Sequence, residues 1–356
     1  MAEVVGSSRS LGSANTAPGG SLPGDVAERT ARVLASFWSL PEATCSIPDG
    51  VATPSATTRP ASSTILTARV RSHAGRPPAF LKMLRHAANF TSEYQGLVGA
   101  RAACPPSLRV RVPAVLHTVE AERALLIEYI PGTRATPWMR RRYLVLPDWC
   151  LPAVRDLGRW LAAYHESRQY YVSPEEFVAG HLRLARRYID DAAERLGAAG
   201  QANAHRLLDA LGRAISAQPV RLTWCHGDLV LNNLIAHERM LYIVDFTRYG
   251  VGPPEADLVG LWSSLRREIG PLPFSAAART RLWSAFVEAY DEASTAGANA
   301  NVLDLWTLEE LTYELAYASH SGQPFSASWL RRTRLASQTA SYLRAWLQER
   351  ARVYSA

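Results

Sequence analysis

Lysine is almost absent from this chain of 356 residues. The chain holds 39 lysine and arginine residues, and Lys82, in the stretch PPAFLKMLR, is the sole lysine among them. A composition that uses arginine at almost every basic position should also have replaced a dispensable lysine. Lys82 is therefore the first candidate for a residue that the function requires.

Cysteine pairs and long apolar runs are also missing. The four cysteines, Cys45, Cys104, Cys150 and Cys225, lie far apart without a C-x-x-C pair, which argues against a zinc site or a disulfide framework. No apolar run approaches ~18 residues and the N-terminus lacks an apolar signal core, so we expect neither secretion nor a membrane span. A reducing cytoplasm is the compartment that fits this cysteine usage.

Basic runs of the kind that bind nucleic acid are missing too. The net charge is +7, but the sequence has no basic run interleaved with aromatics, no zinc-finger spacing and no recognition-helix pattern. We therefore expect the arginines on solvated faces and expect no nucleic-acid partner. Residues 282–330 differ from the rest, because they hold seven carboxylates and neither lysine nor arginine.

The hydrophobic pattern predicts a sheet-rich first part and a helical second part. Residues 1–24 are rich in Gly, Ser, Pro and Ala, which predicts a disordered tail. An amphipathic helix follows from Asp25, and a second helix at 89–103 is flanked by strand-like runs at 63–70, 79–84 and 114–130. Residues 222–247 are typical of loop, strand, turn and strand. Helices are predicted at 152–168, 174–197, 203–217, 254–269, 275–293, 303–319 and 327–350.

Oxygen-bearing side chains gather in the stretch HGDLVLNNLI and in the YIVDF that follows it. Asp228 and Asn233 are five residues apart on one predicted loop, and Asp245 follows the apolar run LYIV. Two carboxylates and an amide oxygen suit Mg²⁺. Phosphoryl transfer needs such a metal to neutralise the spread negative charge, and it needs a group that positions the acceptor hydroxyl.

These motifs, together with LLIEYIPG, PPEADLV and the LGRWLAAYH that ends at His165, resemble the aminoglycoside phosphotransferase and choline kinase family, distant relatives of the protein kinases. The resemblance covers roughly residues 60–265. It implies an α+β, bilobal protein-kinase-like fold with a small antiparallel-sheet N-lobe and a larger helical C-lobe. The nucleotide-binding N-lobe would span 25–130, and the C-lobe, with the catalytic loop and the substrate site, would span 131–356.

The resemblance assigns a role to each residue of the motifs. Asp228 matches the catalytic aspartate, which orients the acceptor hydroxyl and can take its proton. Asn233 and Asp245 match the metal ligands. His226 is interpreted as structural support of the catalytic loop, and Asp257 resembles the buried aspartate that braces this loop.

The same resemblance gives Lys82 a role in an apolar strand of the nucleotide-binding lobe. It implies an ammonium group that contacts the α- and β-phosphates and pairs with a helix glutamate, for which Glu93 is the candidate. A guanidinium is larger and planar, so arginine is a poor substitute there. For Lys82 the alternative is a surface lysine on an edge strand, and for Glu93 it is a solvated helix carboxylate. The backbone of Glu128, Tyr129 and Ile130, in the hinge match, would hold the base.

The acidic stretch gives a weaker indication of the substrate. Glu310 and Glu314 are four residues apart and share one helix face. In the family that the motifs resemble, the substrate lies against the helical lobe, so these carboxylates could attract an amine-bearing substrate. A solvated helix face is the alternative interpretation.

The sequence thus predicts a small-molecule kinase, an ATP- or GTP-dependent O-phosphotransferase with Mg²⁺ that acts on a hydroxyl of a small, amine-bearing metabolite or antibiotic. The alternative is a catalytically silent nucleotide-binding or interaction module of the same fold, which the intact metal and base positions oppose. A protein kinase is disfavoured, because the chain has no G-x-G-x-x-G loop before Lys82 and no APE after Asp245. Residues 56–63 are a guess for the phosphate-covering loop. Nucleotide preference, acceptor identity and oligomeric state stay open.

Overall fold

The computed structural model describes residues 24–38, 64–70, 78–142, 147–268, 273–320 and 327–354. The tail predicted at 1–24, except Gly24, and the guessed phosphate-covering loop at 56–63 lie outside the described residues. The chain divides into two compact units. A sheet unit contains residues 1–101, 112–131 and 245–248, and a helical unit contains residues 102–111, 132–244 and 249–356.

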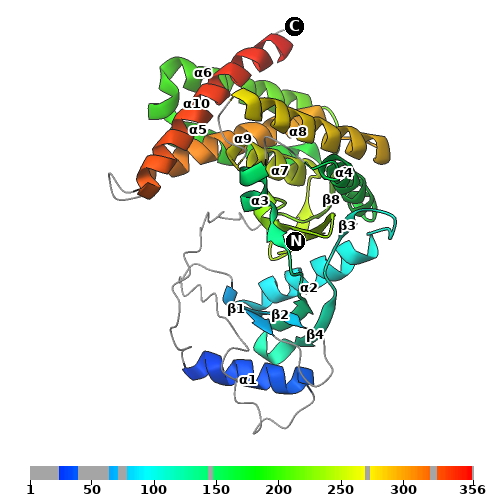
Figure 1. Ribbon diagram of the computed structural model, residues 1–356. Helices are drawn as coiled ribbons and strands as arrows, with labels where there is room; N and C mark the ends of the chain where they lie inside the picture. Colours follow the sequence, from blue (N-terminus) through cyan, green and yellow to red (C-terminus); the bar gives the residue numbers. More distant parts are fainter. Residues whose placement is uncertain are drawn as a thin grey trace. The chain divides into compact units, whose positions relative to one another are not determined.

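One four-stranded antiparallel sheet, in the order β1-β2-β5-β4, organises the sheet unit. Helices α1 and α2 cover this sheet from two sides (Figure 1). The elements of the unit are α1 (Gly24–Trp38), β1 (Thr64–Val70), β2 (Ala79–Leu84), α2 (Ala87–Ala102), β4 (Val115–Val119), η2 (Glu120–Glu122) and β5 (Ala124–Glu128).

The pleat of β2 sends alternate side chains to these two helices. Met83 faces α1, where the Thr30 hydroxyl lies 3.5 Å from its sulfur, and Leu81 belongs to the same apolar core. Lys82 points the other way and forms an ion pair with Glu93 of α2. Successive side chains of a strand point to opposite faces, so the sequence AFLKML places its one charge on the α2 side.

The helical unit contains the remaining helices and two small sheets, in the orders β3-β10-β9-β6 and β11-β8-β7. The helices are α3 (Ala135–Arg142), α4 (Cys150–Glu166), α5 (Pro174–Asp191), α6 (Ala193–Ile215), α7 (Glu255–Glu268), α8 (Pro273–Ala293), α9 (Ala300–His320) and α10 (Ala327–Tyr354). The strands and the 3-10 turn are β3 (Val110–Arg111), β6 (Thr133–Arg134), β7 (Gln169–Val172), β8 (Val220–Cys225), η3 (Leu231–Asn233), β9 (Leu234–His237), β10 (Met240–Ile243) and β11 (Gly250–Gly252).

Apolar side chains from α5, α6, α9 and α10 form one core of the helical unit, with Ile189, Leu208, Leu305 and Leu343 fully buried. Burial of such side chains, each worth about 1.5–3 kcal/mol, stabilises these four helices together. Across the described ranges, we find no helix whose length and apolar character would let it cross a membrane.

The predicted α+β class is confirmed, and most predicted elements are present with shifted ends. Two differences have a local cause. The helix predicted at 174–197 ends at Asp191, and α6 begins at Ala193 and is kinked at Gly197, whose φ of 70° leaves the helical region. Residues 220–225 form strand β8, although the pattern from 222 was typical of a loop.

Candidate active site

Strand β8 positions the HGD motif at the start of the catalytic loop. The strand ends at Cys225, and Gly227 follows with φ of 76°, a left-handed conformation that favours glycine. The turn at Gly227 brings Asp228 next to Asn233. The side-chain amide nitrogen of Asn233, Nδ2, donates to the backbone carbonyl of Asp228 at 2.9 Å and to the Asp228 carboxylate at 3.1 Å. Because the amide nitrogen is engaged in this way, the amide oxygen of Asn233 is the atom suited to a metal.

The His226 ring supports this loop from inside the protein. Its Nδ1 accepts the backbone N–H of Asp228 at 3.2 Å, and its Nε2 lies 3.2 Å from the carbonyl of Val244. A ring that accepts at Nδ1 and donates at Nε2 is a neutral imidazole. His226 is fully buried, so its contacts are those of a structural residue.

Asp257, in the first turn of α7, binds the same loop through its carboxylate. It accepts the backbone N–H of His226 at 2.7 Å and that of Gly227 at 2.8 Å. His165 of α4 lies 3.2 Å away. Burial acts to raise the pKa of Asp257, but the hydrogen bonds from His165 and from the backbone of His226 act against it, and the pKa is held below its usual value. Asp257 is therefore ionised and acts only as an acceptor.

A chain of hydrogen bonds extends from Asp257 to Tyr290 of α8. The Nδ1 of His165 lies 3.0 Å from the Tyr290 hydroxyl, and its Nε2 lies 3.2 Å from the Asp257 carboxylate. An ionised carboxylate can only accept, so Nε2–H of His165 donates to Asp257. In a neutral ring, Nδ1 then accepts from the Tyr290 hydroxyl. We call Tyr290, His165 and Asp257 the relay.

The motifs do not include Tyr290. Tyr290 is 125 residues away from His165 in the sequence, and burial raises its pKa. Tyrosine in an apolar helix face is ordinary core composition, so the sequence offered only one indication, a buried histidine in need of a second partner.

In the sheet unit, Lys82 lies between two carboxylates. Its ammonium is 2.9 Å from Glu93 of α2 and 2.8 Å from Asp245, and the lysine side chain is 6% exposed. Burial acts to lower the pKa of Lys82, but Asp245 and Glu93 together raise it above its usual value. Burial also raises the pKa of Glu93 to about 7, against the charge of Lys82.

Asp245 is held in an unusual backbone conformation, with φ of 70°. The left-handed region costs a non-glycine residue of order 1–3 kcal/mol, which the neighbouring contacts offset. The Thr247 hydroxyl donates to the Asp245 carboxylate at 2.5 Å, and buried Phe246 packs on Gly96 of α2. A Cβ at position 96 would lie 2.6 Å from the Phe246 side chain, so only glycine permits this approach.

The hinge match also lies in the sheet unit, at the end of β5. The Glu128 carboxylate accepts the backbone N–H of Ala114 at 3.1 Å, and the Arg69 guanidinium lies 4.3 Å from the centre of the Tyr129 ring. Ile130 is buried. These contacts fix the side chains, while the assignment of this backbone to the nucleotide base stays a prediction.

The structure therefore brings the predicted residues together in two groups. Lys82, Glu93 and Asp245 meet in the sheet unit. His226, Asp228, Asn233 and Asp257 meet in the helical unit.

Glu310 and Glu314 have partners that the sequence did not suggest. Both are buried on α9, and neither forms a solvated helix face. Arg267 lies 3.4 Å from Glu310 and 3.0 Å from Glu314, and Arg266 also pairs with Glu314. Carboxylates that are neutralised by arginines inside the protein are poor ligands for a cationic substrate. We therefore do not assign Glu310 and Glu314 to the substrate site.

The chain is similar to known proteins in sequence and in fold. The sequence matches the family model described as the phosphotransferase enzyme family over residues 57–295, and no curated protein matches it. A solved structure, glucosamine kinase in complex with glucosamine, ADP and inorganic phosphate, is 19% identical with a TM-score of 0.65, covering 94% of this chain and 89% of that chain. Crystal form A of glucosamine kinase is 16% identical with a TM-score of 0.56, covering 83% and 93%.

At these identities the solved structures establish the fold, which is the kinase-like fold that the motifs predicted. The family model spans more than half of the chain. The chain therefore belongs to the phosphotransferase enzyme family, and the prediction that it is a small-molecule phosphotransferase is confirmed.

Proposed function

We propose that this phosphotransferase moves the γ-phosphoryl group of ATP or GTP to a hydroxyl group of a small, amine-bearing molecule. The observation that carries the proposal is the position of the sole lysine. Lys82 is buried between Glu93 and Asp245, at 2.9 and 2.8 Å, in a chain that uses arginine everywhere else. A buried ammonium held by two carboxylates is suited to receive the phosphates of a nucleotide.

Mg²⁺ fits the side chains that the motifs assign to it. Asn233 offers an amide oxygen and Asp245 a carboxylate, both hard oxygen ligands. The backbone N–H of Val244 donates to the carbonyl of Asn233 at 3.0 Å, and Asp245 is the next residue in the chain. When bound, the ion would neutralise charge on the β- and γ-phosphates.

Each protein side chain then has one task in the transfer. Lys82 binds the phosphates and Glu93 keeps its ammonium in place, while Asp245 would hold the metal. Asp228 accepts the proton of the acceptor hydroxyl, and Asn233 holds the Asp228 carboxylate in position. The bond that forms joins the acceptor oxygen to the γ-phosphorus. The bond that breaks joins the γ-phosphorus to the β–γ bridging oxygen, and ADP or GDP leaves.

The acceptor class rests on the fold comparison. The solved structure with the TM-score of 0.65 contains glucosamine, a hydroxylated amine, beside ADP and phosphate. Amino sugars are therefore the first acceptors to test, followed by aminoglycosides and choline-like compounds.

The test is transfer of label from γ-labelled ATP and GTP, with Mg²⁺, to a panel of hydroxylated amines. Asp228→Asn is the blank, and we expect it to bind nucleotide without transferring label. Asp209→Asn is the matched control, because Asp209 forms an exposed ion pair with Arg186 in the same unit. Label on one acceptor class with the wild type and with Asp209→Asn, and none with Asp228→Asn, supports the proposal. Equal transfer by Asp228→Asn contradicts the role of Asp228.

The alternative, a silent nucleotide-binding module, has its own signature in this experiment. It predicts saturable nucleotide binding with no transfer to any acceptor and no slow release of phosphate to water. Phosphate release that depends on Asp228 would already exclude it, even before the acceptor is identified.

A further inference from the structure

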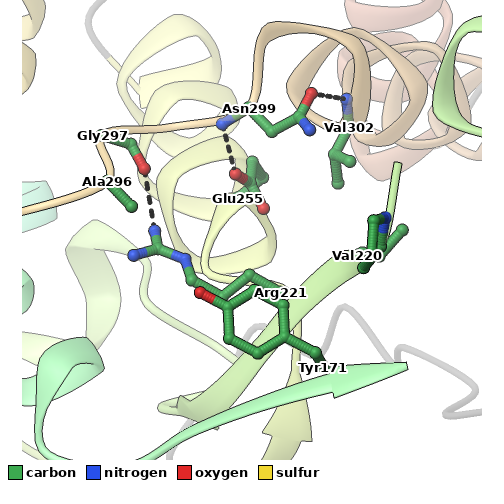
Figure 2. A pocket seen from close by; sticks show the side chains of 9 residues that line it. Tyr171, Val220, Arg221, Glu255, Ala296, Gly297, Asn299 and Val302 are labelled. Atoms are coloured by element: carbon green, nitrogen blue, oxygen red, sulfur yellow. Dashed lines mark hydrogen bonds between the residues drawn. The ribbon is translucent and has the colours of Figure 1, made fainter. Parts of the chain in front are cut away.

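A cavity of about 200 Å³ lies in the helical unit. It is bounded by β7, the start of β8, the first residue of α7 and the segment that leads from α8 into α9 (Figure 2). Since one water takes about 30 Å³ of liquid volume, the cavity has room for a ligand of roughly six non-hydrogen atoms. Its lining residues are Tyr171, Pro219, Val220, Arg221, Glu255, Ala296, Gly297, Asn299 and Val302.

The cavity is separate from the catalytic loop. Val220 and Arg221 begin β8, while Asp228 lies beyond the other end of this strand. At about 3.3 Å per residue, the ends of the six-residue strand are roughly 17 Å apart. A ligand small enough for the cavity cannot contact Asp228 as well.

One wall of the cavity carries a buried carboxylate that lacks a cationic partner. Glu255 is 2% exposed and accepts the backbone N–H of Asn299 at 2.7 Å. Within the described ranges it forms no ion pair. Burial raises the pKa of Glu255 to about 7, against the N–H of Asn299 and the charge of Arg221. A positive ligand beside Glu255 would add to the stabilisation of its ionised form, which burial disfavours.

The nearby cation is engaged with another acid. Arg221 lies 3.3 Å from the carboxylate of Glu166 and donates to the carbonyl of Gly297 at 2.8 Å. Glu166 also accepts the backbone N–H and the hydroxyl of Thr295, at 3.1 and 2.9 Å. These bonds already fasten the segment between α8 and α9, so its attachment does not require the charge of Glu255.

The other walls fit an alkyl group. Val220, Pro219 and Val302 contribute apolar surface, and the Tyr171 ring, 64% exposed, lies at the edge of the cavity. Figure 2 shows Glu255 between Asn299 on one side and Arg221 and Tyr171 on the other. The Glu255 carboxylate offers the charge that pairs with an organic ammonium ion, and the Tyr171 ring adds apolar surface at the edge of the cavity.

We propose that this cavity binds a small alkylammonium ion, whose ammonium group pairs with Glu255 while its alkyl chain contacts Val220 and Val302. The site differs from the acceptor site of the phosphotransferase and does not depend on the proposed acceptor class. Its ligand carries an amine and an alkyl group of two to four carbons, as the size of the cavity requires.

Isothermal titration of the full-length protein with n-propylammonium chloride tests the proposal, with n-propanol as the uncharged probe of the same shape. We expect saturable binding of the ammonium ion and at least about tenfold weaker binding of the alcohol, because only the ion pairs with the carboxylate. Glu255→Gln keeps an acceptor for Asn299 and should lower the affinity by about the same factor. Glu288→Gln removes one charge from an exposed position and should leave binding unchanged.

Three further measurements separate this site from others. Tyr171→Ala should weaken binding about threefold. Tyr171 is exposed, so this substitution should leave the fold intact. Binding should strengthen as the pH rises through 7, because Glu255 must be ionised. The other ionisable groups near it are Arg221, Tyr171, Tyr290 and Cys225. Asp228→Asn should bind as the wild type does. Absence of saturable binding, full binding in Glu255→Gln, or loss of binding in Asp228→Asn would each overturn the proposal.

Discussion

Each unit contains a cluster of largely buried charges, and these two clusters use different basic residues. In the sheet unit one lysine, Lys82, is shared by Glu93 and Asp245. In the helical unit two arginines, Arg266 and Arg267, meet Glu314 of α9. The arginine cluster is completed by hydroxyls of Ser263 and Thr339, which donate to Glu314 at 2.7 and 3.1 Å, and by Glu310.

The difference shows why the chain keeps a single lysine. Guanidinium groups present several fixed donors, so Arg266 and Arg267 can fix α7 against α9 through permanent, directed bonds. An ammonium is a compact charge whose donors rotate, so Lys82 can exchange one partner for another. One of its partners, Asp245, has a side chain that is 41% exposed and can turn to another ligand. We infer that arginine serves the cluster that must hold two helices together. Lysine serves the cluster whose ammonium must exchange one ion-pair partner for another.

The largest effect should come from breaking the arginine cluster. Glu314→Gln leaves Arg266 without its carboxylate and Arg267 with Glu310 alone, and we expect a loss of about 3–5 kcal/mol in the free energy of unfolding. Urea unfolding followed by tryptophan fluorescence measures it, since nine of the ten tryptophans, all but Trp38, lie in the helical unit. Under conditions in which Glu314→Gln remains folded, it should transfer the phosphoryl group at the rate of the wild type. A stable but inactive variant would show that this cluster takes part in function.

Lys82→Arg should have the opposite profile. The charge is kept, so the cluster stays compensated, but the planar group cannot take the place of the ammonium at the phosphates. We expect the turnover to fall by about 10²–10³, the effect of losing one well-placed donor to a transferring group. Steady-state phosphotransfer and thermal unfolding should be measured on the same sample. An active Lys82→Arg enzyme would refute the explanation given above for the lone lysine.

The sequence carried enough information to predict the first cluster but not the second. Lys82 falls in a strand and Glu93 in the helix that follows it, so a short connection brings them to the same face of the sheet. Glu314 is 47 residues away from Arg267, and nothing local marks the pair. A chain with 38 arginines offers too many candidate partners for a carboxylate, and only packing selects among them.

The same limit applies to the candidate site. Asp228 and Asn233 lie on one loop, and their contact follows from their spacing. The left-handed conformation of Asp245 and the donation from Tyr290 to His165 depend on elements that are distant in the sequence. The cavity beside Glu255 has the same origin, since four separate segments form its walls.

The two clusters should also respond to pH in opposite directions. Burial raises the pKa of Glu93 to about 7, so the folded state binds the Glu93 proton more tightly than the unfolded state does. The stability that this proton contributes is lost as the pH rises from about 4.5 to 7. For Glu314 burial is outweighed by Arg266 and Arg267, which lower the pKa, so stability is lost only as the pH falls below about 4.5.

Urea titrations between pH 4 and 8 measure both slopes. From the Glu93 pKa alone, up to about 3 kcal/mol would be lost between pH 4.5 and 7. Glu93→Gln should remove this part of the slope, while the part due to Glu255, whose pKa is also about 7, should stay. Identical slopes in the wild type and in Glu93→Gln would show that Lys82 keeps Glu93 ionised throughout.

The smallest effect should come from the relay, which reaches the catalytic loop without an arginine or a lysine. Tyr290→Phe removes the donor to Nδ1 of His165 and leaves the ring without its fixed direction. We expect kcat to fall by about tenfold, the cost of one buried hydrogen bond, with the KM for nucleotide unchanged. Nitrogen NMR of the His165 ring should show Nε2 protonated in the wild type and a mixture of tautomers in the variant. If kcat falls while His165 keeps its tautomer, Tyr290 acts through packing and not by orienting the ring.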